Sequence, residues 1–325
     1  MSSKHTIKDV AAAAEVSAMT VSRVFRRDKH VSPATAELVL EAARRLNYHP
    51  DASARALRGC ATNSIGVIAS NTLWSARTLR NISKPLLPLG YTIFYSDSLG
   101  DEKLATTALN EFAGSRMDAI LLEWRDNYKT IQPKIERMKN VIIFGFDNTL
   151  KTSCDFCHID IKKALCGALN KLRAAGKRNI WQLCPQVMRF RHIFDEFGLQ
   201  DNWIDTSLFH YTSNESENHL NAFIDFLSRG GKADAVFCDN DTAAGYLCRY
   251  LQSQNIRVPE DVAVIGFADN PLAQFTAPSL SSIDINPLGL GETLARAAIH
   301  RLKNPAAPKQ ELVFEAQFIE RESSK

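Results

Sequence analysis

Beyond residue 63 the sequence alternates between short apolar runs and stretches with helical periodicity, and this alternation constrains the fold most strongly. The apolar runs cover residues 64–70, 91–96, 119–123, 141–146, 180–184, 235–238 and 262–267. Helical stretches separate them, for example at 104–113, 162–175, 218–228 and 242–254. Because strand–helix alternation builds parallel sheets covered by helices, it predicts an α/β architecture. The alternation pauses near Asp160 and restarts, which favours two doubly wound parallel-sheet lobes over one sheet.

Polar and aromatic side chains follow several of these strands, at the sheet edge where ligands bind in such folds. They are Asn71, Trp74, Glu123, Trp124, Arg125, Asp147, Asn148, Asn240, Asp241, Asp269 and Asn270. Any one of them could instead cap a loop. Their recurrence at equivalent strand ends favours a pocket for a polar, hydroxyl-rich molecule or for a cation.

The first sixty residues predict three short helices instead. Thr6 and Asp9 have the spacing of a capping box, Ser17 offers a second N-cap, and Ser32 precedes a proline at the start of a third helix. Only about three residues separate the first two helices, which indicates a helix-turn-helix unit. An ordinary helical bundle with standard caps would carry the same signals.

The second of these helices has the features of a recognition helix. Val21 and Val24 are expected to face the core, which leaves the side chains of Ala18, Met19, Ser22 and Arg23 facing outward. An arginine there can bond guanine O6 and N7, and a methionine can contact a thymine methyl group. The hydroxyls of Ser17, Thr20, Ser22 and Thr35 are expected to bind phosphate oxygens near helix N-termini.

The charge distribution agrees with a nucleic-acid partner for this segment. The whole chain carries a formal charge of +3, but its first 60 residues hold ten Lys and Arg against six Asp and Glu. The remaining residues are close to neutral. Excess positive charge on one small segment favours contact with a polyanion, although a solvated charged surface would look the same.

The order and spacing of these residues closely resemble the DNA-binding head of the lac repressor (LacI/GalR) family. The matching strings are TIKDVA at 6–11, TVSRV at 20–24, HVS at 30–32, LNY at 46–48 and ARALR at 54–58. The resemblance implies further DNA contacts from the family head, at Thr6, His30, Ser32, Tyr48, Ala54 and Leu57. Glu15 stands where the family usually has glycine, so a non-glycine residue is expected at positive φ in the bend.

The resemblance also implies a hinge helix at residues 51–61. In the family this stretch orders when two copies pair over the minor groove and each inserts a leucine between base steps. Leu57 holds that position here, and an apolar wedge of this kind unstacks and bends the duplex. A flexible linker is the alternative, because an isolated helix of about nine residues is marginal in water.

The family's two-lobed, periplasmic-binding-protein-like core matches most strongly at residues 237–245, 258–271, 278–283 and 321–323. The expected organisation is a head at 1–50, a hinge at 51–61 and an effector-binding and dimerisation core at 62–325. Lobe 1 is expected at about 62–160 with a return segment after about 284. Lobe 2 is expected at about 161–283 with the C-terminal segment.

The expected effector site departs from the sugar-responsive members of the family. Gln186 stands where many have arginine, and Arg189 is a candidate substitute. Ala268 and Asp269 replace the common acidic pair, and Ile285 replaces a crossover glutamine. The resemblance therefore implies an unusual effector, either a sugar or another polar metabolite, or a response that has been lost.

Other classes of function lack support in the sequence. No apolar signal segment or membrane-length run is present, so a reduced, cytoplasmic protein is expected. Cys154, Cys157 and His158 match a haem-attachment pattern, but no export signal accompanies it and no fourth zinc ligand is evident. No nucleotide-binding or catalytic motif occurs, so we expect no cofactor, no metal and no enzyme activity. A sugar carrier and a hydrolase on the same scaffold remain the alternatives.

The resemblance implies a sequence-specific DNA-binding transcription regulator, most simply a repressor. A homodimer would bind a near-palindromic operator, because two-fold symmetry presents two copies of one reading surface. A small molecule between the lobes would modulate its operator affinity. The sequence ends without a heptad tail, which favours a dimer over a tetramer built on a coiled coil.

Overall fold

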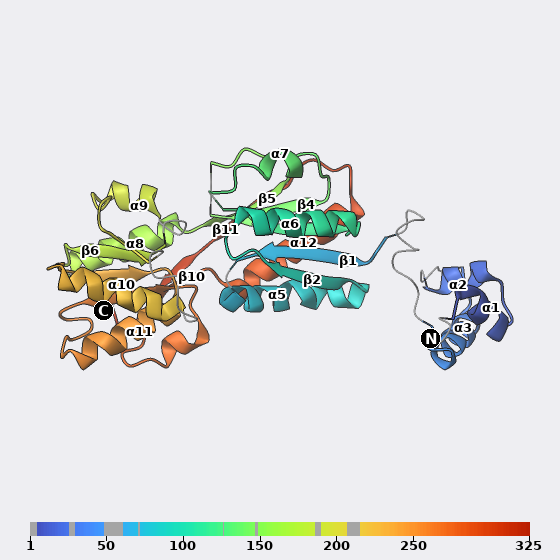
Figure 1. Ribbon diagram of the computed structural model, residues 1–325, viewed down its shortest axis with the longest axis horizontal. Helices are drawn as coiled ribbons and strands as arrows, with labels where there is room; N and C mark the ends of the chain where they lie inside the picture. The colour runs from blue at the N-terminus through green and yellow to red at the C-terminus, as the bar shows by residue number, and fades with distance from the viewer. Residues whose placement is uncertain are drawn as a thin grey trace. The chain divides into compact units, whose positions relative to one another are not determined.

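The structure is a computed structural model that describes residues 5–25, 30–48, 61–70, 72–125, 127–146, 149–185, 190–206 and 215–325. Ala54, Leu57, Asn71, Asp147, Gln186 and Arg189 lie outside the described residues. The chain divides into two compact units, Met1–Thr62 and Asn63–Lys325 (Figure 1). We describe each unit by itself.

The first unit contains three helices, α1 (Ile7–Ala13), α2 (Ala18–Phe25) and α3 (Pro33–Arg45). The predicted helix starts are confirmed. The Thr6 N–H donates to the Asp9 carboxylate at 2.6 Å, the Ser17 hydroxyl accepts from the Thr20 N–H at 3.1 Å, and the Ser32 hydroxyl accepts from the Thr35 N–H at 3.1 Å. These caps satisfy N–H groups that have no partner within a helix.

The bend between α1 and α2 contains the predicted non-glycine residue at positive φ. Glu15 has φ of 53°, and the Val16 N–H returns to the Ala11 carbonyl at 3.0 Å. The bend folds α2 back onto α1, so that Val10, Val21 and Val39 are fully buried in one small core. These apolar contacts hold the helix-turn-helix together.

Lobe 1 of the second unit is a six-stranded sheet in which every pair is parallel. Its strand order is β11 (Glu311–Glu315), β5 (Asp155–Asp160), β4 (Val141–Gly145), β3 (Ala119–Glu123), β1 (Ser64–Ala69) and β2 (Thr92–Asp97). Its helices are α5 (Thr72–Leu86), η1 (Leu87–Leu89), α6 (Glu102–Gly114), α7 (Gln132–Ile135) and α12 (Pro287–Lys303). The central strands are buried on both faces, which explains their continuous apolar runs.

Lobe 2 is a second six-stranded sheet. Its strand order is β12 (Gln317–Ile319), β10 (Ser281–Asp284), β9 (Ala263–Phe267), β8 (Ala235–Cys238), β6 (Ile180–Cys184) and β7 (Trp203–Asp205). Its helices are α8 (Lys162–Ala174), α9 (Arg191–Glu196), α10 (Glu215–Ser228), α11 (Asp241–Ser253) and η4 (Pro271–Gln274). The two predicted parallel-sheet lobes are confirmed. At one edge of lobe 2, β12 pairs with β10 in the antiparallel sense as the chain returns from lobe 1.

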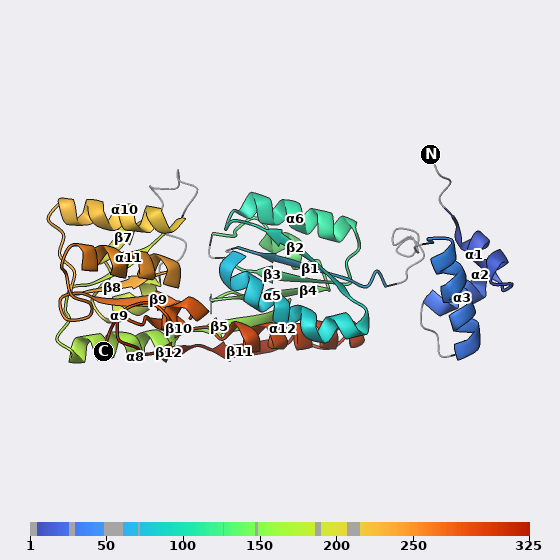
Figure 2. The same cartoon turned by 90° about the horizontal axis from the view of Figure 1, so that it is seen from below.

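The chain passes between the lobes after β5, after β10 and again between β11 and β12. The second crossing places α12 beside α5 in lobe 1, as both views show (Figures 1 and 2). Gly291 permits this close packing, because a Cβ atom there would lie 2.5 Å from the Thr78 carbonyl oxygen. The packing fixes α5 against the rest of lobe 1.

The Cys154–His158 pattern does not form a metal site. Cys154 and Cys157 are buried, and Cys157 and His158 are neighbours on β5, where successive side chains point to opposite faces. No cluster of metal-ligating side chains occurs within the described part of the chain. Among the same residues, no helix combines the length and apolar character needed to span a bilayer.

Candidate functional site

The recognition helix α2 presents a small, mixed surface. Val21 and Val24 are buried, as expected, whereas Met19 is 59% exposed and Arg23 is exposed. Ala18 and Ser22 are half-buried beside them. The structure thus places an exposed apolar side chain in the first turn of a capped helix and an exposed guanidinium in its last turn. This combination can contact a thymine methyl group and a guanine edge.

The predicted phosphate-binding hydroxyls lie at helix starts and are linked in pairs. Ser17 and Thr20 share a hydroxyl–hydroxyl bond of 3.0 Å, and Ser32 and Thr35 share one of 2.8 Å. Each pair places hydroxyls beside the first N–H groups of a helix, where the macrodipole favours an anion. His30 is exposed next to the second pair.

Two residues of the predicted DNA surface have structural partners. The Thr6 hydroxyl donates to Asp9 at 2.8 Å, and this contact, together with the backbone bond from Thr6, lowers the pKa of the Asp9 carboxyl group. Tyr48 is half-buried and packs against Phe25 with ring centroids 5.8 Å apart. Both residues therefore stabilise the head, and their DNA contacts stay a prediction.

At the carboxyl end of β3, Glu123 and Trp124 are buried within lobe 1. The Glu123 carboxylate accepts from the Ser70 N–H at 2.5 Å and from its hydroxyl at 2.9 Å, and it pairs with Arg125 at 3.2 Å. Arg125 also donates to the Ser70 hydroxyl. Trp124 is 5% exposed and packs edge-on against Tyr128. These contacts lock the strand ends together.

In lobe 2, Asn240 and Asp241 begin α11. Asn240 is the N-cap and accepts from the Ala243 N–H at 2.7 Å. Asp241 is buried and accepts from the Ser282 hydroxyl at 2.6 Å and from the Asn270 N–H at 2.5 Å. Burial is the largest cause that raises the pKa of Asp241 from 3.8 to about 7. Asp241 therefore joins the start of α11 to the loop after β9 and to strand β10.

Asp269 follows β9, and its carboxylate, its N–H and its carbonyl all form hydrogen bonds. Its carboxylate forms a two-pronged ion pair with Arg321 at 2.7 and 3.2 Å, and its N–H donates to the Ser282 hydroxyl at 3.1 Å. Its carbonyl accepts from Arg77 of lobe 1 at 2.8 Å. The sequence identified Asp269 but not Arg77 or Arg321. The sequence signals for this pair were the arginine of the RES string at 321–323 and the single acid of the Ala268–Asp269 pair.

Sequence reasoning also missed a buried pair in lobe 2. The Nε2 atom of His219, on α10, lies 2.7 Å from the Oδ1 atom of Asp239, which follows β8. Both side chains are at most 9% exposed. The pair ties α10 to the same sheet edge. Four of the predicted site residues follow soon after the end of a strand: Trp74, in the first turn of α5, and Asn240, Asp241 and Asp269.

Aromatic rings connect the two lobes. Phe146, which follows β4 of lobe 1, packs edge-on against Phe190 at 5.9 Å and Phe267 at 5.7 Å, both of lobe 2. Phe190 also stacks on Phe267 at 5.6 Å. The contact between lobes is therefore apolar at this point, unlike the polar contact at Asp269.

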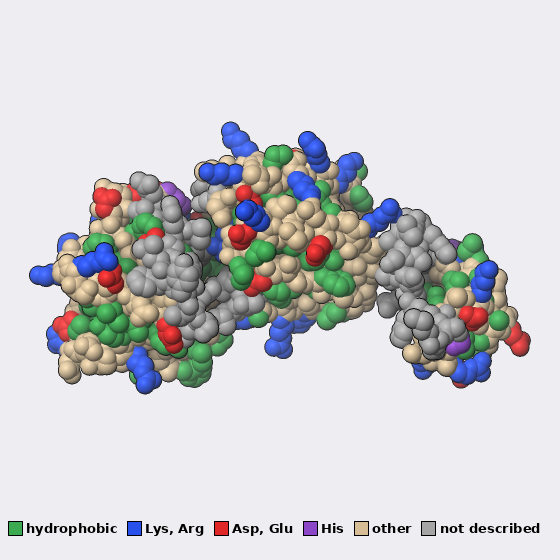
Figure 3. All heavy atoms as spheres, viewed as in Figure 1, with side chains coloured by type: hydrophobic (Ala, Val, Ile, Leu, Met, Phe, Trp, Pro, Cys, Tyr) green, Lys and Arg blue, Asp and Glu red, His purple; other side chains and the backbone are tan. Residues whose placement is uncertain are grey.

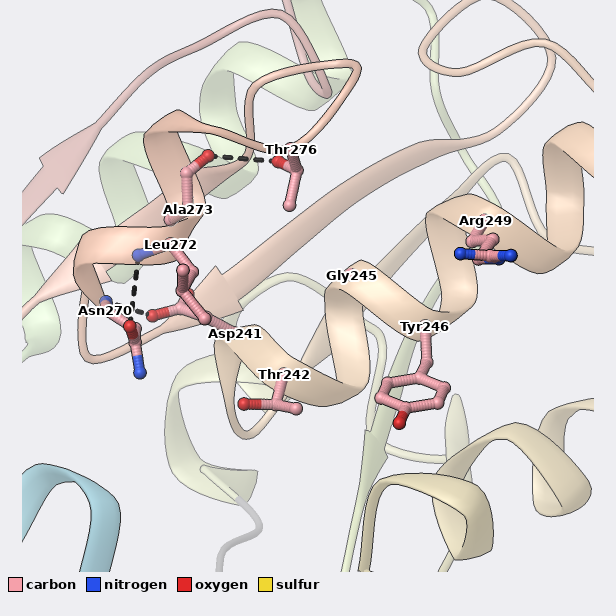
Figure 4. A pocket seen from close by; sticks show the side chains of 9 residues that line it. All are labelled: Asp241, Thr242, Gly245, Tyr246, Arg249, Asn270, Leu272, Ala273 and Thr276. Atoms are coloured by element: carbon pink, nitrogen blue, oxygen red, sulfur yellow. Dashed lines mark hydrogen bonds between the residues drawn. The ribbon is translucent and has the colours of Figure 1, made fainter.

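A separate pocket of about 350 Å³ lies on lobe 2 between α11 and η4 (Figure 4). Tyr246 and Arg249 project from the α11 side, and Leu272 and Thr276 line the other side. Leu272 and the adjacent Phe275 are 68% and 78% exposed. Large exposed apolar side chains of this kind mark surfaces that contact other molecules.

Two parts of the chain match known protein families. Residues 6–51 match the bacterial regulatory proteins of the lacI family, and residues 170–324 match a periplasmic binding protein-like domain. The HTH-type transcriptional repressor PurR of Salmonella newport (strain SL254) is 29% identical over 335 residues, covering 98% of this chain and 96% of PurR.

Solved structures agree on the fold. The lac repressor dimer bound to operator and the anti-inducer ONPF has a TM-score of 0.79 at 22% identity, covering 98% of this chain and 99% of that chain. The complex of the transcriptional regulator CelR with cellobiose has a TM-score of 0.65 at 24% identity, with the same coverage. The relatives are transcription regulators rather than enzymes. A capped helix-turn-helix head followed by a two-lobed α/β core, with these matches, shows that the chain belongs to the lacI family of bacterial regulatory proteins and is a DNA-binding transcription regulator.

Proposed function

We propose that the protein is a repressor that binds a near-palindromic operator as a homodimer. The observation that carries this proposal is the exposed pair Met19 and Arg23 on α2, beside the capped starts of α2 and α3. Apolar and guanidinium groups read base edges, and the helix starts bind the flanking phosphates. Such a function operates in the cytoplasm, where the protein meets the chromosome.

Homodimer formation is supported by exposed apolar side chains on the core. In lobe 1, Leu87 and Leu89 are 60% and 48% exposed beside Phe94 of the edge strand β2, which is 46% exposed. In lobe 2, Leu272 lines the pocket of Figure 4, and Phe275, three residues further along, is 78% exposed. Exposed apolar side chains also stand among the charged ones on the face drawn in Figure 3. A second copy would remove such side chains from water.

A small polar molecule between the lobes would modulate operator affinity. Asn240 and Asp269 of lobe 2 border this region, and Asn71, Asp147, Gln186 and Arg189, which lie outside the described residues, are proposed as further contacts. The carboxylate of Asp269 is already paired with Arg321, so it is a weaker acceptor for sugar hydroxyls than a free acid. This pairing supports an effector other than a conventional monosaccharide. A ligand that binds only the native state would raise the melting temperature, so a thermal-shift screen of polar metabolites would identify it.

A selection from random duplexes tests DNA recognition. Purified full-length protein is expected to enrich an inverted repeat, because a two-fold dimer presents the same α2 surface twice. Affinity for the enriched duplex should exceed that for random duplexes by at least about 10³-fold at physiological salt. Both affinities should fall steeply with added salt, since phosphate contacts release counterions. Equal affinity for selected and random duplexes would refute the proposal.

A further inference from the structure

A polar contact joins the two lobes beside the crossing that follows β10. The Arg77 guanidinium, on α5 of lobe 1, donates from Nη1 to the carbonyl oxygen of Asp269 in lobe 2 at 2.8 Å. Arg77 is half-buried. A hydrogen bond from a charged donor is stronger than a neutral one, and any N–H···O bond weakens steeply as its angle falls, so this contact is sensitive to how the lobes are oriented.

The acceptor is a fixed point of lobe 2. The Asp269 N–H donates to the Ser282 hydroxyl, and its carboxylate holds Arg321, which also donates to the Leu280 carbonyl at 2.7 Å. The following N–H, of Asn270, is bonded to the buried Asp241 at 2.5 Å. Movement of the carbonyl would therefore break several bonds within lobe 2.

The backbone at this point has an unusual conformation. Ala268 has φ of 87° and Asp269 has φ of 44°. L residues rarely adopt positive φ, and an alanine has no side-chain hydrogen bond to compensate for it. Strain of this kind persists only where surrounding contacts determine it. Contacts with Ser282 and Arg321, both within lobe 2, hold this conformation. The conformation directs the Asp269 carbonyl oxygen toward Arg77.

The donor is fixed to lobe 1 in turn. Arg77 precedes Thr78 on α5. The Thr78 carbonyl oxygen lies so close to Gly291 of α12 that a Cβ atom on this glycine would be 2.5 Å away from it. The same guanidinium also acts on Asp284 at the end of β10. Burial raises the pKa of the Asp284 carboxyl group, and the positive charge of Arg77 opposes that rise. Arg77 thus lies close to an acidic part of lobe 2 that includes Asp269 and Asp284.

We propose that Arg77 is a latch that fixes the angle between the lobes. The aromatic contact of Phe146 with Phe190 and Phe267 is non-directional, so those rings can remain in contact while the lobes rotate. The Arg77 bond requires one orientation. Breaking it shifts the balance between lobe arrangements, and through that balance changes operator affinity. The effect on DNA rests on the proposed function, whereas the latch itself does not.

Hydrogen exchange of the full-length protein, without DNA or effector, tests the latch. We compare Arg77→Gln with the wild type, with Arg77→Lys and with the matched control Arg80→Gln, an exposed arginine on the same helix. Arg77→Gln should accelerate exchange of the amides at 268–270 at least about tenfold, because the loop that carries them loses its contact across the lobe boundary and opens more often. Arg77→Lys should give a smaller effect, and Arg80→Gln none.

The location of the change separates a latch from loss of structure. A merely structural role of Arg77 within lobe 1 would accelerate exchange in α5 and leave 268–270 at the wild-type rate, which would overturn the proposal. So would equal acceleration throughout both lobes. Wild-type operator affinity of Arg77→Gln, measured on the selected duplex, would overturn the coupling to DNA. Failure of the wild-type selection would instead refute the proposed function.

Discussion

At the scale of single residues, the carboxylates at the strand ends are held by partners that lie far away in the sequence. Ser70 donates two hydrogen bonds to Glu123 at the end of β3, 53 residues further along, although Glu123 is predicted to contact the effector. Asp269 was predicted in the same way, and Arg321, 52 residues further along, pairs with it. Partners so distant in sequence meet only when the fold forms, so no local pattern could identify them.

Arg23 is the residue on which base recognition is expected to depend. Arg23→Ala should weaken binding to the selected operator by about 1–3 kcal/mol and relax the preference at one base pair, because two bonds to one guanine are lost. Titrations against single-base variants of the operator measure this. Arg45→Ala, an exposed arginine of α3, is the control. A uniform loss of affinity across all variants would mean that Arg23 contacts phosphate instead.

The buried Asp241 predicts an unusual dependence of stability on pH. Its pKa is raised from 3.8 to about 7 in the folded protein, chiefly by burial. The folded state therefore holds a proton that the unfolded state releases, so the contribution to stability is present below about pH 4 and is lost as the pH rises to about 7. This loss is on the order of 2–4 kcal/mol.

Asp241→Asn should remove that slope. The amide can accept from the Asn270 N–H and donate to the Ser282 hydroxyl, and it does not ionise. Urea unfolding between pH 4.5 and 8 should show the free energy of unfolding falling with pH in the wild type and in Asp201→Asn, an exposed control. Parallel curves for the wild type and Asp241→Asn would contradict the prediction.

At the scale of elements, the buried apolar strands and the capped helices were predictable, whereas a short polar strand such as β10 was not. β3, up to its final Glu123, and β4 have no polar side chain and are buried at every position, so their runs were visible in the sequence. β10 begins with Ser281 and Ser282, whose hydroxyls are bonded to the Arg321 carbonyl and to Asp241. Tertiary partners, rather than propensity, make those serines a strand.

The bend between α1 and α2 offers a test of strain at this scale. Glu15 is exposed with φ of 53°, so Glu15→Gly should relieve about 1 kcal/mol of backbone strain. Part of that gain is offset because glycine also has more freedom in the unfolded chain. We expect a net stabilisation of roughly 0.5 kcal/mol in denaturant unfolding of the head.

Ala12→Gly is the matched control. Ala12 is exposed within α1, where glycine costs about 1 kcal/mol relative to alanine. The two glycine substitutions should therefore change stability in opposite directions, although they lie three residues apart. If both destabilise the head, Glu15 must contribute contacts that outweigh the strain at its backbone.

At the scale of the whole molecule, operator binding requires that two heads act together, and the core is the part that can join them. Among the exposed apolar side chains of the core, two groups stand around η1 and β2 in lobe 1 and around η4 in lobe 2, whereas Leu104, Leu288 and Val313 stand elsewhere. Neither patch could be predicted from the sequence. A run such as 271–276 has the same composition whether its leucine and phenylalanine face the core or the solvent.

Phe275 is the most exposed large apolar side chain among the described residues, at 78%. If the face around η4 joins two copies, Phe275→Glu should place two charges in an apolar interface and shift the dimer toward monomer. Sedimentation velocity should show that shift, and operator affinity should fall at least about tenfold, which corresponds to about 1.4 kcal/mol, since a monomer binds one half-site. Val313→Glu is the control, because Val313 is 67% exposed on the opposite side of lobe 1 from β2. A Phe275→Glu variant that remains dimeric would move the interface away from this face, and a monomeric variant with full operator affinity would show that one head suffices.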